Sequence, residues 1–183
     1  PVAASVFGLV KSQHMDWTNE MIRTMVLATA DPIIYDVNSE NYLEGMLGKG
    51  RVDSYKAIQT PLFPKIEYAG VDIYILNDSD GYINPGEQIE LSVVLVNDPS
   101  WGTAENASGF LVSLNADINI INPNVDFGNI SPGEVGINVE SPFQIIFDSS
   151  MDNLNVELYL YFSSNQNDYV EYTTSIPITL TLE

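Results

Sequence analysis

Nine residues in the last quarter of the chain decide the fold: Leu154-Asn155-Val156-Glu157-Leu158-Tyr159-Leu160-Tyr161-Phe162. Apolar residues occupy every second position of this stretch, and polar or amphipathic residues occupy the positions between them. A period of two is typical of a β-strand, because successive side chains of a strand point to opposite faces of the sheet. The stretch therefore predicts a strand with one face in a hydrophobic core and the other toward solvent.

The same alternation recurs on both sides of this stretch. Phe110, Val112 and Leu114 alternate with polar or small residues and are expected to face the core, as are Ile176, Ile178, Leu180 and Leu182. Further strands are predicted over residues 71–76, 89–96, 118–121 and 143–147. Clusters of Asn, Asp, Gly, Pro and Ser separate them, and short strands at this spacing indicate an antiparallel β-sandwich, immunoglobulin-like in type. Pro177 is expected on an edge strand or at a bulge, because proline donates no ladder hydrogen bond.

The first third of the chain has a helical pattern instead. Residues 2–12 are rich in Ala, Val and Leu around most of the helical circumference, which predicts a helix buried in a larger body. A second helix is expected after Thr18 as its N-cap, with Met21, Ile22, Met25 and Val26 on one stripe, and to stop at Asp31-Pro32. A short third helix is predicted over residues 52–58. Such helices cannot enclose a core alone and require a sheet to cover.

A break in composition separates these two parts. All six Lys and Arg residues lie in the first 65 positions beside seven acids, whereas residues 66–183 contain 18 acids and no Lys or Arg. Pro61 and Pro64 interrupt any helix at this point. We therefore predict an α + β chain with a helical domain at residues 1–60, a linker at 61–66 and an acidic β-sandwich domain at 67–183.

Charge and composition exclude several classes of protein. The formal net charge of −19 opposes binding to nucleic acid and to anionic membrane surfaces. No apolar run approaches the roughly 20 residues needed to span a bilayer. The absence of cysteine excludes disulfides, thiol nucleophiles and cysteine-ligated metals. With 45% hydrophobic residues the chain is expected to be globular rather than disordered.

Three segments of the helical part resemble subtilisin-like serine proteases, in the order and spacing of that family. They are Pro1-Val2-Ala3-Ala4-Ser5, Trp17-Thr18-Asn19-Glu20-Met21-Ile22-Arg23 with Leu27-Ala28-Thr29-Ala30, and Leu47-Gly48-Lys49-Gly50-Arg51-Val52-Asp53 with Ala57. The first is similar to the stretch just after the nucleophile in the family's G-T-S-x-A-x-P-x-x-A-G motif. Ser5 departs from this motif, where the family has glycine, and Ser54 departs from the family pattern in the third segment, where the family has alanine. The resemblance covers residues 1–58 and implies the C-terminal end of a subtilisin-like α/β peptidase domain.

The resemblance implies a secreted or cell-surface bacterial serine endopeptidase that cleaves protein or peptide substrates. The family's reactive serine would fall four positions before Pro1, and its aspartate and histidine precede that serine. No catalytic residue is therefore expected in this chain, which is predicted to be inactive by itself and to begin within a longer protein. His14, the only histidine, is expected to be a surface residue of a connecting loop.

An acidic loop in the second part offers oxygen ligands. Residues 77–87 place Asp78, Asp80 and Glu87 at calcium-loop spacing, and Ca²⁺ prefers several oxygen ligands. No oxygen-bearing side chain stands at the first position, and Pro85-Gly86 excludes an EF-hand. A strand-flanked Ca²⁺ site is one interpretation. A solvated hairpin loop is the other, since turns use the same residue types.

A second class of function is a non-catalytic binding or adhesion module of a cell-surface protein, with the sandwich as its working part. Tyr159, Tyr161, Tyr169 and Tyr172 are expected to be exposed and would form an aromatic carbohydrate-binding face. Alternating tyrosines are also common as ordinary cross-strand pairs. The sandwich is thus expected to stabilise a peptidase, to space it from a surface, or to contact a polymer.

Overall fold

The structure is a computed structural model that describes residues 2–38, 45–76, 80–151, 155–166 and 170–181. For residues 155, 165–166 and 170–181 it describes the backbone only. The chain divides into two compact units. The helical unit comprises residues 1–63 with 166–170, and the sheet unit comprises residues 64–165 with 171–183.

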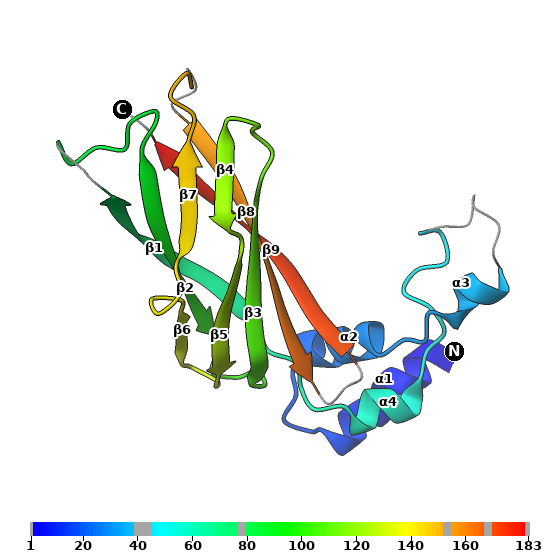
Figure 1. Cartoon of the computed structure of the whole chain (residues 1–183). Helices are drawn as coiled ribbons and strands as arrows, with labels where there is room; N and C mark the ends of the chain where they lie inside the picture. The colour runs from blue at the N-terminus through cyan, green and yellow to red at the C-terminus, as the bar shows by residue number, and fades with distance from the viewer. Residues whose placement is uncertain (1, 39–44, 77–79, 152–154, 167–169, 182–183) are drawn as a thin grey trace. The chain divides into compact units, whose positions relative to one another are not determined.

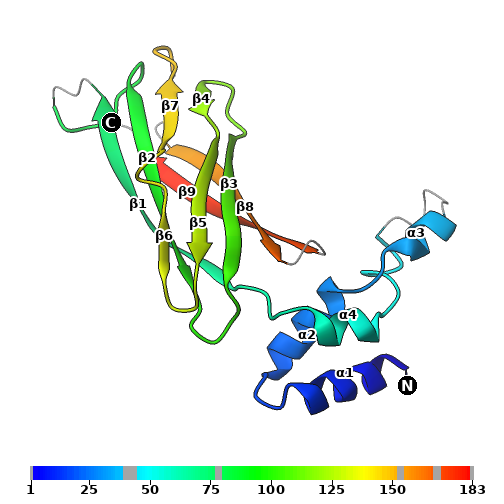
Figure 2. The same cartoon turned by 60° about the horizontal axis from the view of Figure 1, so that its bottom comes forward.

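Four helices are described in the helical unit: α1 (Val2–Gln13), α2 (Asn19–Ala28), α3 (Ile33–Val37) and α4 (Ser54–Gln59). Helices α1, α2 and α4 contact one another, as Figure 2 shows, and bury the side chains of Val6, Val10, Met21, Ile22, Met25, Val26 and Ala57. The buried stripe of α2 is the one that the sequence predicts. The predicted helix over residues 52–58 begins at Ser54, because Asp53 is its N-cap. The five-residue helix α3 was not predicted.

The sheet unit contains nine described strands, drawn in Figure 1: β1 (Ile66–Leu76), β2 (Gln88–Asn97), β3 (Ala104–Ser113), β4 (Ile118–Asn122), β5 (Asn124–Ile130), β6 (Val135–Ile137), β7 (Phe143–Phe147), β8 (Asn155–Gln166) and β9 (Val170–Thr181). One sheet has the order β1-β2-β7-β4, with β6 also paired to β2, and the other has the order β5-β3-β8-β9. The six strand pairs with a described register are antiparallel. The chain is therefore of α + β class with antiparallel sheets.

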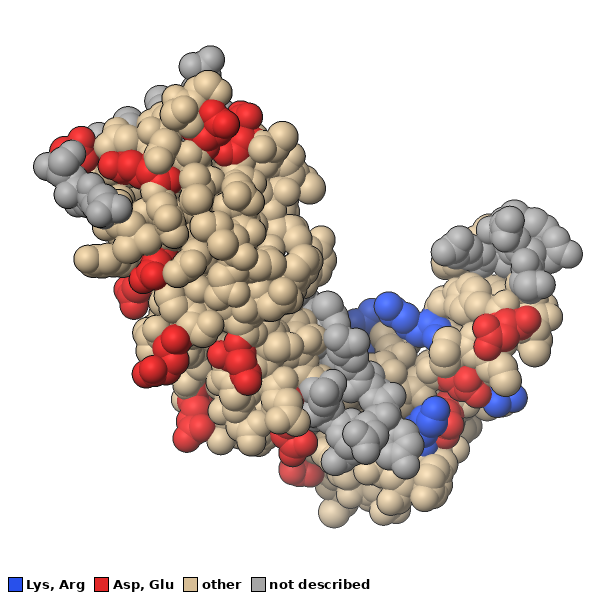
Figure 3. All heavy atoms as spheres, in the orientation of Figure 1, with Lys and Arg blue, Asp and Glu red and all other residues tan. Residues whose placement is uncertain are grey.

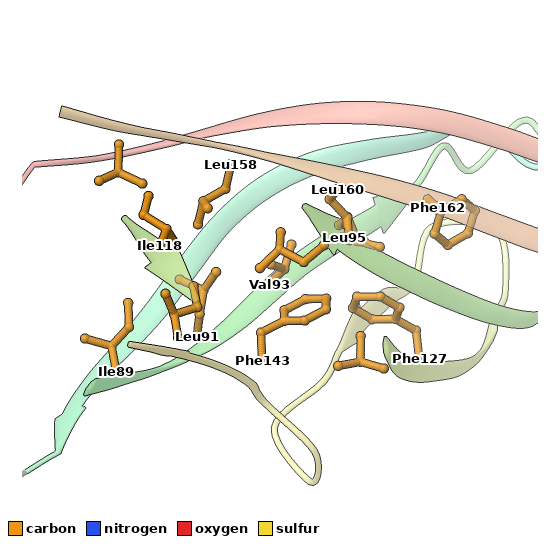
Figure 4. Packing of buried hydrophobic residues seen from close by; sticks show 14 of the residues in the cluster. Ile89, Leu91, Val93, Leu95, Ile118, Phe127, Phe143, Leu158, Leu160 and Phe162 are labelled. Atoms are coloured by element: carbon orange, nitrogen blue, oxygen red, sulfur yellow. The ribbon is translucent and has the colours of Figure 1, made fainter. Parts of the chain in front are cut away.

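One hydrophobic cluster joins the two sheets. It contains Leu91 and Val93 from β2, Phe143 from β7, and Leu158 and Phe162 from β8, which point toward one another in Figure 4. At about 25 cal/mol per Å² of apolar area removed from water, such burial is the main favourable term for a unit of this size. The two sheets are thus held together by a single core.

The decisive stretch behaves as its alternation predicts. Val156, Leu158, Leu160 and Phe162 of β8 are buried, whereas Glu157 and Tyr161 are exposed. Leu154 lies outside the described residues. The predicted strands over 71–76, 89–96, 118–121 and 143–147 fall within β1, β2, β4 and β7. Pro177 lies in β9, at the end of its sheet's strand order, as expected of a proline in a strand.

The predicted orientation of β3 is wrong. Phe110 and Leu114 are exposed and Val112 is half-buried, while Ala107, Gly109 and Leu111 face the core. The reason is steric: a Cβ on Gly109 would lie 2.8 Å from Cε2 of Phe127 and 2.9 Å from Cδ1 of Leu160. The core face of β3 therefore has room only for a glycine at position 109, where Phe127 and Leu160 of the neighbouring strands fill the space that a side chain would take.

Candidate functional site

Helix α1 begins in the segment that resembles the end of the protease nucleophile motif. Only Val6 and Val10 of this helix are buried. Val2 is 75% exposed and Leu9 is 43% exposed, and Ala3, Ala4, Ser5 and Gly8 are exposed as well. Most of the surface that α1 presents is therefore apolar or small. Exposed apolar surface is typical of a face that packs against another segment or partner.

His14 lies in the connecting loop between α1 and α2, as predicted, but its side chain packs against neighbouring residues instead of lying on the open surface. Its ring is half-buried and stacks on Trp17, with 3.7 Å between ring centroids and 8° between planes. Its Nε2 atom lies 3.2 Å from the carbonyl oxygen of Ile58. Lys11 holds the same loop by donating from Nζ to the carbonyl oxygens of Met15 and Trp17, at 2.8 and 2.6 Å. These contacts give His14 a packing role between the α1–α2 loop and α4.

The other motif residues of the helical unit hold its turns. Thr18 caps α2, since its Oγ1 accepts a hydrogen bond from the Met21 amide at 3.2 Å. Asp53 caps α4 by accepting from the Lys56 amide at 2.9 Å. Gly50 has a φ of +127°, and a Cβ there would lie 2.7 Å from the Asp31 carbonyl carbon. Each of these positions has a structural role in the turns and caps of the helical unit.

In the acidic loop, Asn84 binds both of the described carboxylates. Its Nδ2 donates to Oδ1 and Oδ2 of Asp80, each at 3.3 Å, and its backbone amide donates to Oε2 of Glu87 at 2.8 Å. Asp80 also accepts from the Tyr82 amide at 3.0 Å. The two described carboxylates of the predicted site thus accept hydrogen bonds from residues of their own loop and stabilise its turn.

The described residues alone do not fit a Ca²⁺ site. Asp78 lies outside them, and in the described part of the chain no three His, Asp or Glu side chains gather closely enough to hold a metal ion. Calcium binding by Asp78, Asp80 and Glu87 stays a prediction of the sequence. Isothermal titration with CaCl₂ tests it: heat that Asp80→Ala removes would support the site, and no heat would remove it.

A group of aromatic side chains lies on the outer face of the four-stranded sheet. Tyr161 is 45% exposed and pairs directly with Phe110, which is 44% exposed. Tyr159 lies two residues earlier on the same face and donates from its hydroxyl to Oε2 of Glu157 at 3.0 Å. This hydrogen bond, and then the charge of Glu157, raises the pKa of Tyr159. Tyr169 lies outside the described residues, and only the backbone of Tyr172 is described.

Phe110 is the member of this group that sequence reasoning missed. The run of Ala107, Gly109 and Leu111 on the opposite face of β3 was the available signal. Small residues such as Ala107 and Gly109 at alternate positions indicate a face that is closely packed by neighbouring strands, so Phe110, between Gly109 and Leu111, is expected on the opposite, outer face.

Comparisons with known proteins do not identify a family for this chain. No protein-family description matches the chain, and no curated protein sequence matches it. A FixG-related protein from Vibrio parahaemolyticus is similar in structure, with 11% identity, a TM-score of 0.34, and coverage of 62% of this chain and 95% of that chain. Spo0M, a sporulation control protein from Bacillus subtilis, is similar at 14% identity and a TM-score of 0.28, covering 64% and 51% of the two chains. Similarity this low does not establish a shared function.

Membrane insertion through helices finds no support in the described part of the chain. None of the helices there combines the length and the apolar character that a membrane-spanning helix requires.

Proposed function

We propose that the chain is part of a secreted bacterial subtilisin-like serine endopeptidase. Residues 1–60 would be the closing helices of the peptidase domain, and residues 67–183 an immunoglobulin-like accessory sandwich. The support is the order of the three motif segments, together with their structural roles at the caps and turns of α2 and α4. The substrate would be a protein or a peptide.

The observation that carries this proposal is the uncovered apolar surface of α1. In a complete peptidase domain, strands and helices that precede these residues would cover Val2, Leu9 and the small residues between them. The N-terminus of α1 would then support the turn of the reactive serine. Its helix dipole would favour negative charge that develops nearby in the transition state.

The chemistry would reside outside this sequence. A serine hydroxyl is a weak nucleophile until a histidine accepts its proton and a carboxylate orients that histidine. The role proposed for the helical unit is therefore to position the serine turn, and the chain by itself is expected to lack peptidase activity.

The gene supplies the first test. We expect codons for Gly-Thr-Ser-x-Ala-x immediately before Pro1, which puts the serine four positions before it, and any other sequence there would contradict the proposal. The second test expresses the longer protein. It should cleave casein and react with a fluorophosphonate probe, and a Ser→Ala change in that motif should abolish both. The 183-residue chain is the matched control and should do neither.

A non-catalytic binding module of a cell-surface protein is the second candidate. The exposed rings of Phe110 and Tyr161 favour it, because aromatic side chains on an open sheet face are frequent in binding surfaces. The two candidates differ in the upstream sequence and in probe labelling. An unlabelled longer protein without the serine motif would favour the module.

A further inference from the structure

The outer face of β3 and β8 carries rings and polar groups in successive rungs. Phe110 stands directly opposite Tyr161 in the register of the two strands, and Val112 stands opposite Tyr159 in the next outward-facing rung. Outward-facing rungs lie about 6.8 Å apart along a strand, and neighbouring strands lie about 4.8 Å apart. The rings therefore form a strip along the sheet rather than an isolated contact.

Hydrogen-bonding groups border this strip on the same face. Asn124 of β5 pairs with Phe110 on the side away from Tyr161, and its side chain is exposed. Glu157 accepts the hydrogen bond of the Tyr159 hydroxyl at one end of the strip. The hydroxyls of Ser108 and Ser163 lie 3.0 Å apart in the rung on the other side of Phe110. Each ring thus has an amide, a carboxylate or a hydroxyl beside it.

This mixture of groups differs from a protein-docking patch, whose centre is a contiguous apolar surface with its polar groups at the rim. It matches a sugar chain. A pyranose ring presents a flat face of C–H groups, which carry slight positive charge and stack on the negative face of an aromatic ring. Its edge presents hydroxyls, which pair with amides and carboxylates.

The charge of the sheet unit selects among sugar chains. Residues 66–183 contain 18 acids and no Lys or Arg, and Lys65, at the start of the sheet unit, places its Nζ 5.7 Å from the ring centroid of Trp101. Acidic side chains are spread over the face of the sheet unit that Figure 3 shows. Polyanions such as nucleic acids and acidic polysaccharides would be repelled, because residues 64–183 carry one cation, Lys65, against 18 acids. A neutral polysaccharide carries no charge, so the negative field of the sheet unit would not weaken its binding.

We propose that the outer face of β3 and β8 binds a neutral polysaccharide, with sugar rings stacked on Phe110 and Tyr161 and hydroxyls bonded to Asn124 and Glu157. This site belongs to the sheet unit alone. It does not depend on peptidase activity, so either proposal can fail without the other.

Affinity electrophoresis of the full 183-residue chain tests the proposal. Native gels would contain xylan, mixed-linkage β-glucan or galactomannan, and titration calorimetry with the oligosaccharide of the retarding polymer would follow. We expect retardation by at least one of the three. Phe110→Ala and Tyr161→Ala should each weaken binding at least tenfold, while Tyr161→Phe, which keeps the ring, should retain most of it.

Tyr74→Ala is the matched control. Tyr74 is 66% exposed in β1 of the other sheet, so its loss removes an exposed tyrosine without touching the strip. Urea unfolding curves would show that all variants are folded. Equal loss of binding in Tyr74→Ala and Tyr161→Ala would overturn the proposal.

Two further arms separate stacking from bulk charge. Chitosan oligomers, which are cationic, and polygalacturonate, which is anionic, would be titrated in 20 mM and 500 mM NaCl. Binding to a neutral glycan that persists at high salt supports the proposal. Binding to chitosan alone, lost at high salt and unchanged by Phe110→Ala, would overturn it, as would the absence of retardation by all three neutral polymers.

Discussion

The side chain of Asn138 supplies hydrogen bonds that a strand would otherwise give to β2. Strand β2 pairs with β7 up to Leu91 and with β6 from Val94 onward. At the change of partner, Oδ1 of Asn138 accepts from the Val93 amide at 2.7 Å, and Nδ2 lies 3.4 Å from the Leu91 carbonyl oxygen. Asn138 is buried, so these groups have little access to water.

We predict that Asn138→Ala lowers the free energy of unfolding of the sheet unit by about 1–3 kcal/mol, because it strands buried backbone groups. Asn138→Asp should destabilise as well, since it keeps the acceptor but loses the donor and buries a charge. Urea denaturation measures both. The control is Asn119→Ala, at an exposed position of β4, which should change stability by less than about 0.5 kcal/mol. A similar small effect for Asn138→Ala would contradict the assigned role.

Helix α2 depends on its cap more than on its own propensity. It has ten residues, and a helix of this length is not stable alone in water. The Thr18 side chain accepts from the Met21 amide, one of the amides that have no partner within the helix. The Thr18 amide in turn lies 3.3 Å from Sδ of Met21. We predict that Thr18→Ala lowers stability by about 1 kcal/mol and that Thr18→Ser retains most of the wild-type value. Thermal unfolding followed by circular dichroism provides the measurement. Equal loss in both variants would show that the threonine methyl, not its oxygen, is what counts.

Asp31 links the end of α2 to the turn before α4. Its backbone exchanges two hydrogen bonds with Arg51, and its carboxylate accepts from the Ile33 amide at 3.1 Å and from the Arg51 guanidinium at 2.9 Å. The Ile33 hydrogen bond, and next that of Arg51, hold the pKa of this half-buried carboxyl below its ordinary value of 3.8.

A lowered pKa means that the folded state favours the ionised carboxyl. This contribution to stability is fully present above the unfolded pKa near 3.8 and is lost as the pH falls through the lower folded value. We predict that Asp31→Asn is less stable than wild type at pH 6 and that the difference shrinks below pH 4. Melting temperatures of the two proteins across pH 3–6 check this. A difference that stays constant over that range would assign the effect to the lost side-chain hydrogen bonds rather than to the charge.

Periodic elements were predictable, whereas elements defined by contacts distant in sequence were not. The alternation of β8 and the stripe and cap of α2 depend on neighbours within a few residues, so the chain itself displays them. The face of β3 depends on Phe127 and Leu160, which pack over Gly109 from other strands. Strand β6 has three residues and no period to detect, and α3 has five. Of the predicted metal site, only Asp80 and Glu87 are described, and their partner Asn84 was not foreseen.

Acidity is divided unequally along the chain. Residues 1–65 carry six basic and seven acidic residues, whereas residues 66–183 carry 18 acids alone. In Figure 3 the acidic side chains of the sheet unit are spread over its surface rather than gathered at one point. Self-repulsion of this kind opposes the compact state at low ionic strength, because charges within a Debye length, about 10 Å at 0.1 M salt, act on one another.

We therefore predict that added NaCl raises the melting temperature of the sheet unit more than that of the helical unit. Trp101 lies in the sheet unit and Trp17 in the helical unit. The fluorescence of the Trp17→Phe variant therefore reports the sheet unit, and that of the Trp101→Phe variant reports the helical unit. Between 20 and 500 mM NaCl, the transition reported by Trp101 should rise by a few degrees, and the one reported by Trp17 should change little. Choline chloride should act as NaCl does if screening is the cause. Equal shifts in both units would point to a general salt effect on burial, and no shift in the sheet unit would mean that its carboxylates lie too far apart to repel one another appreciably.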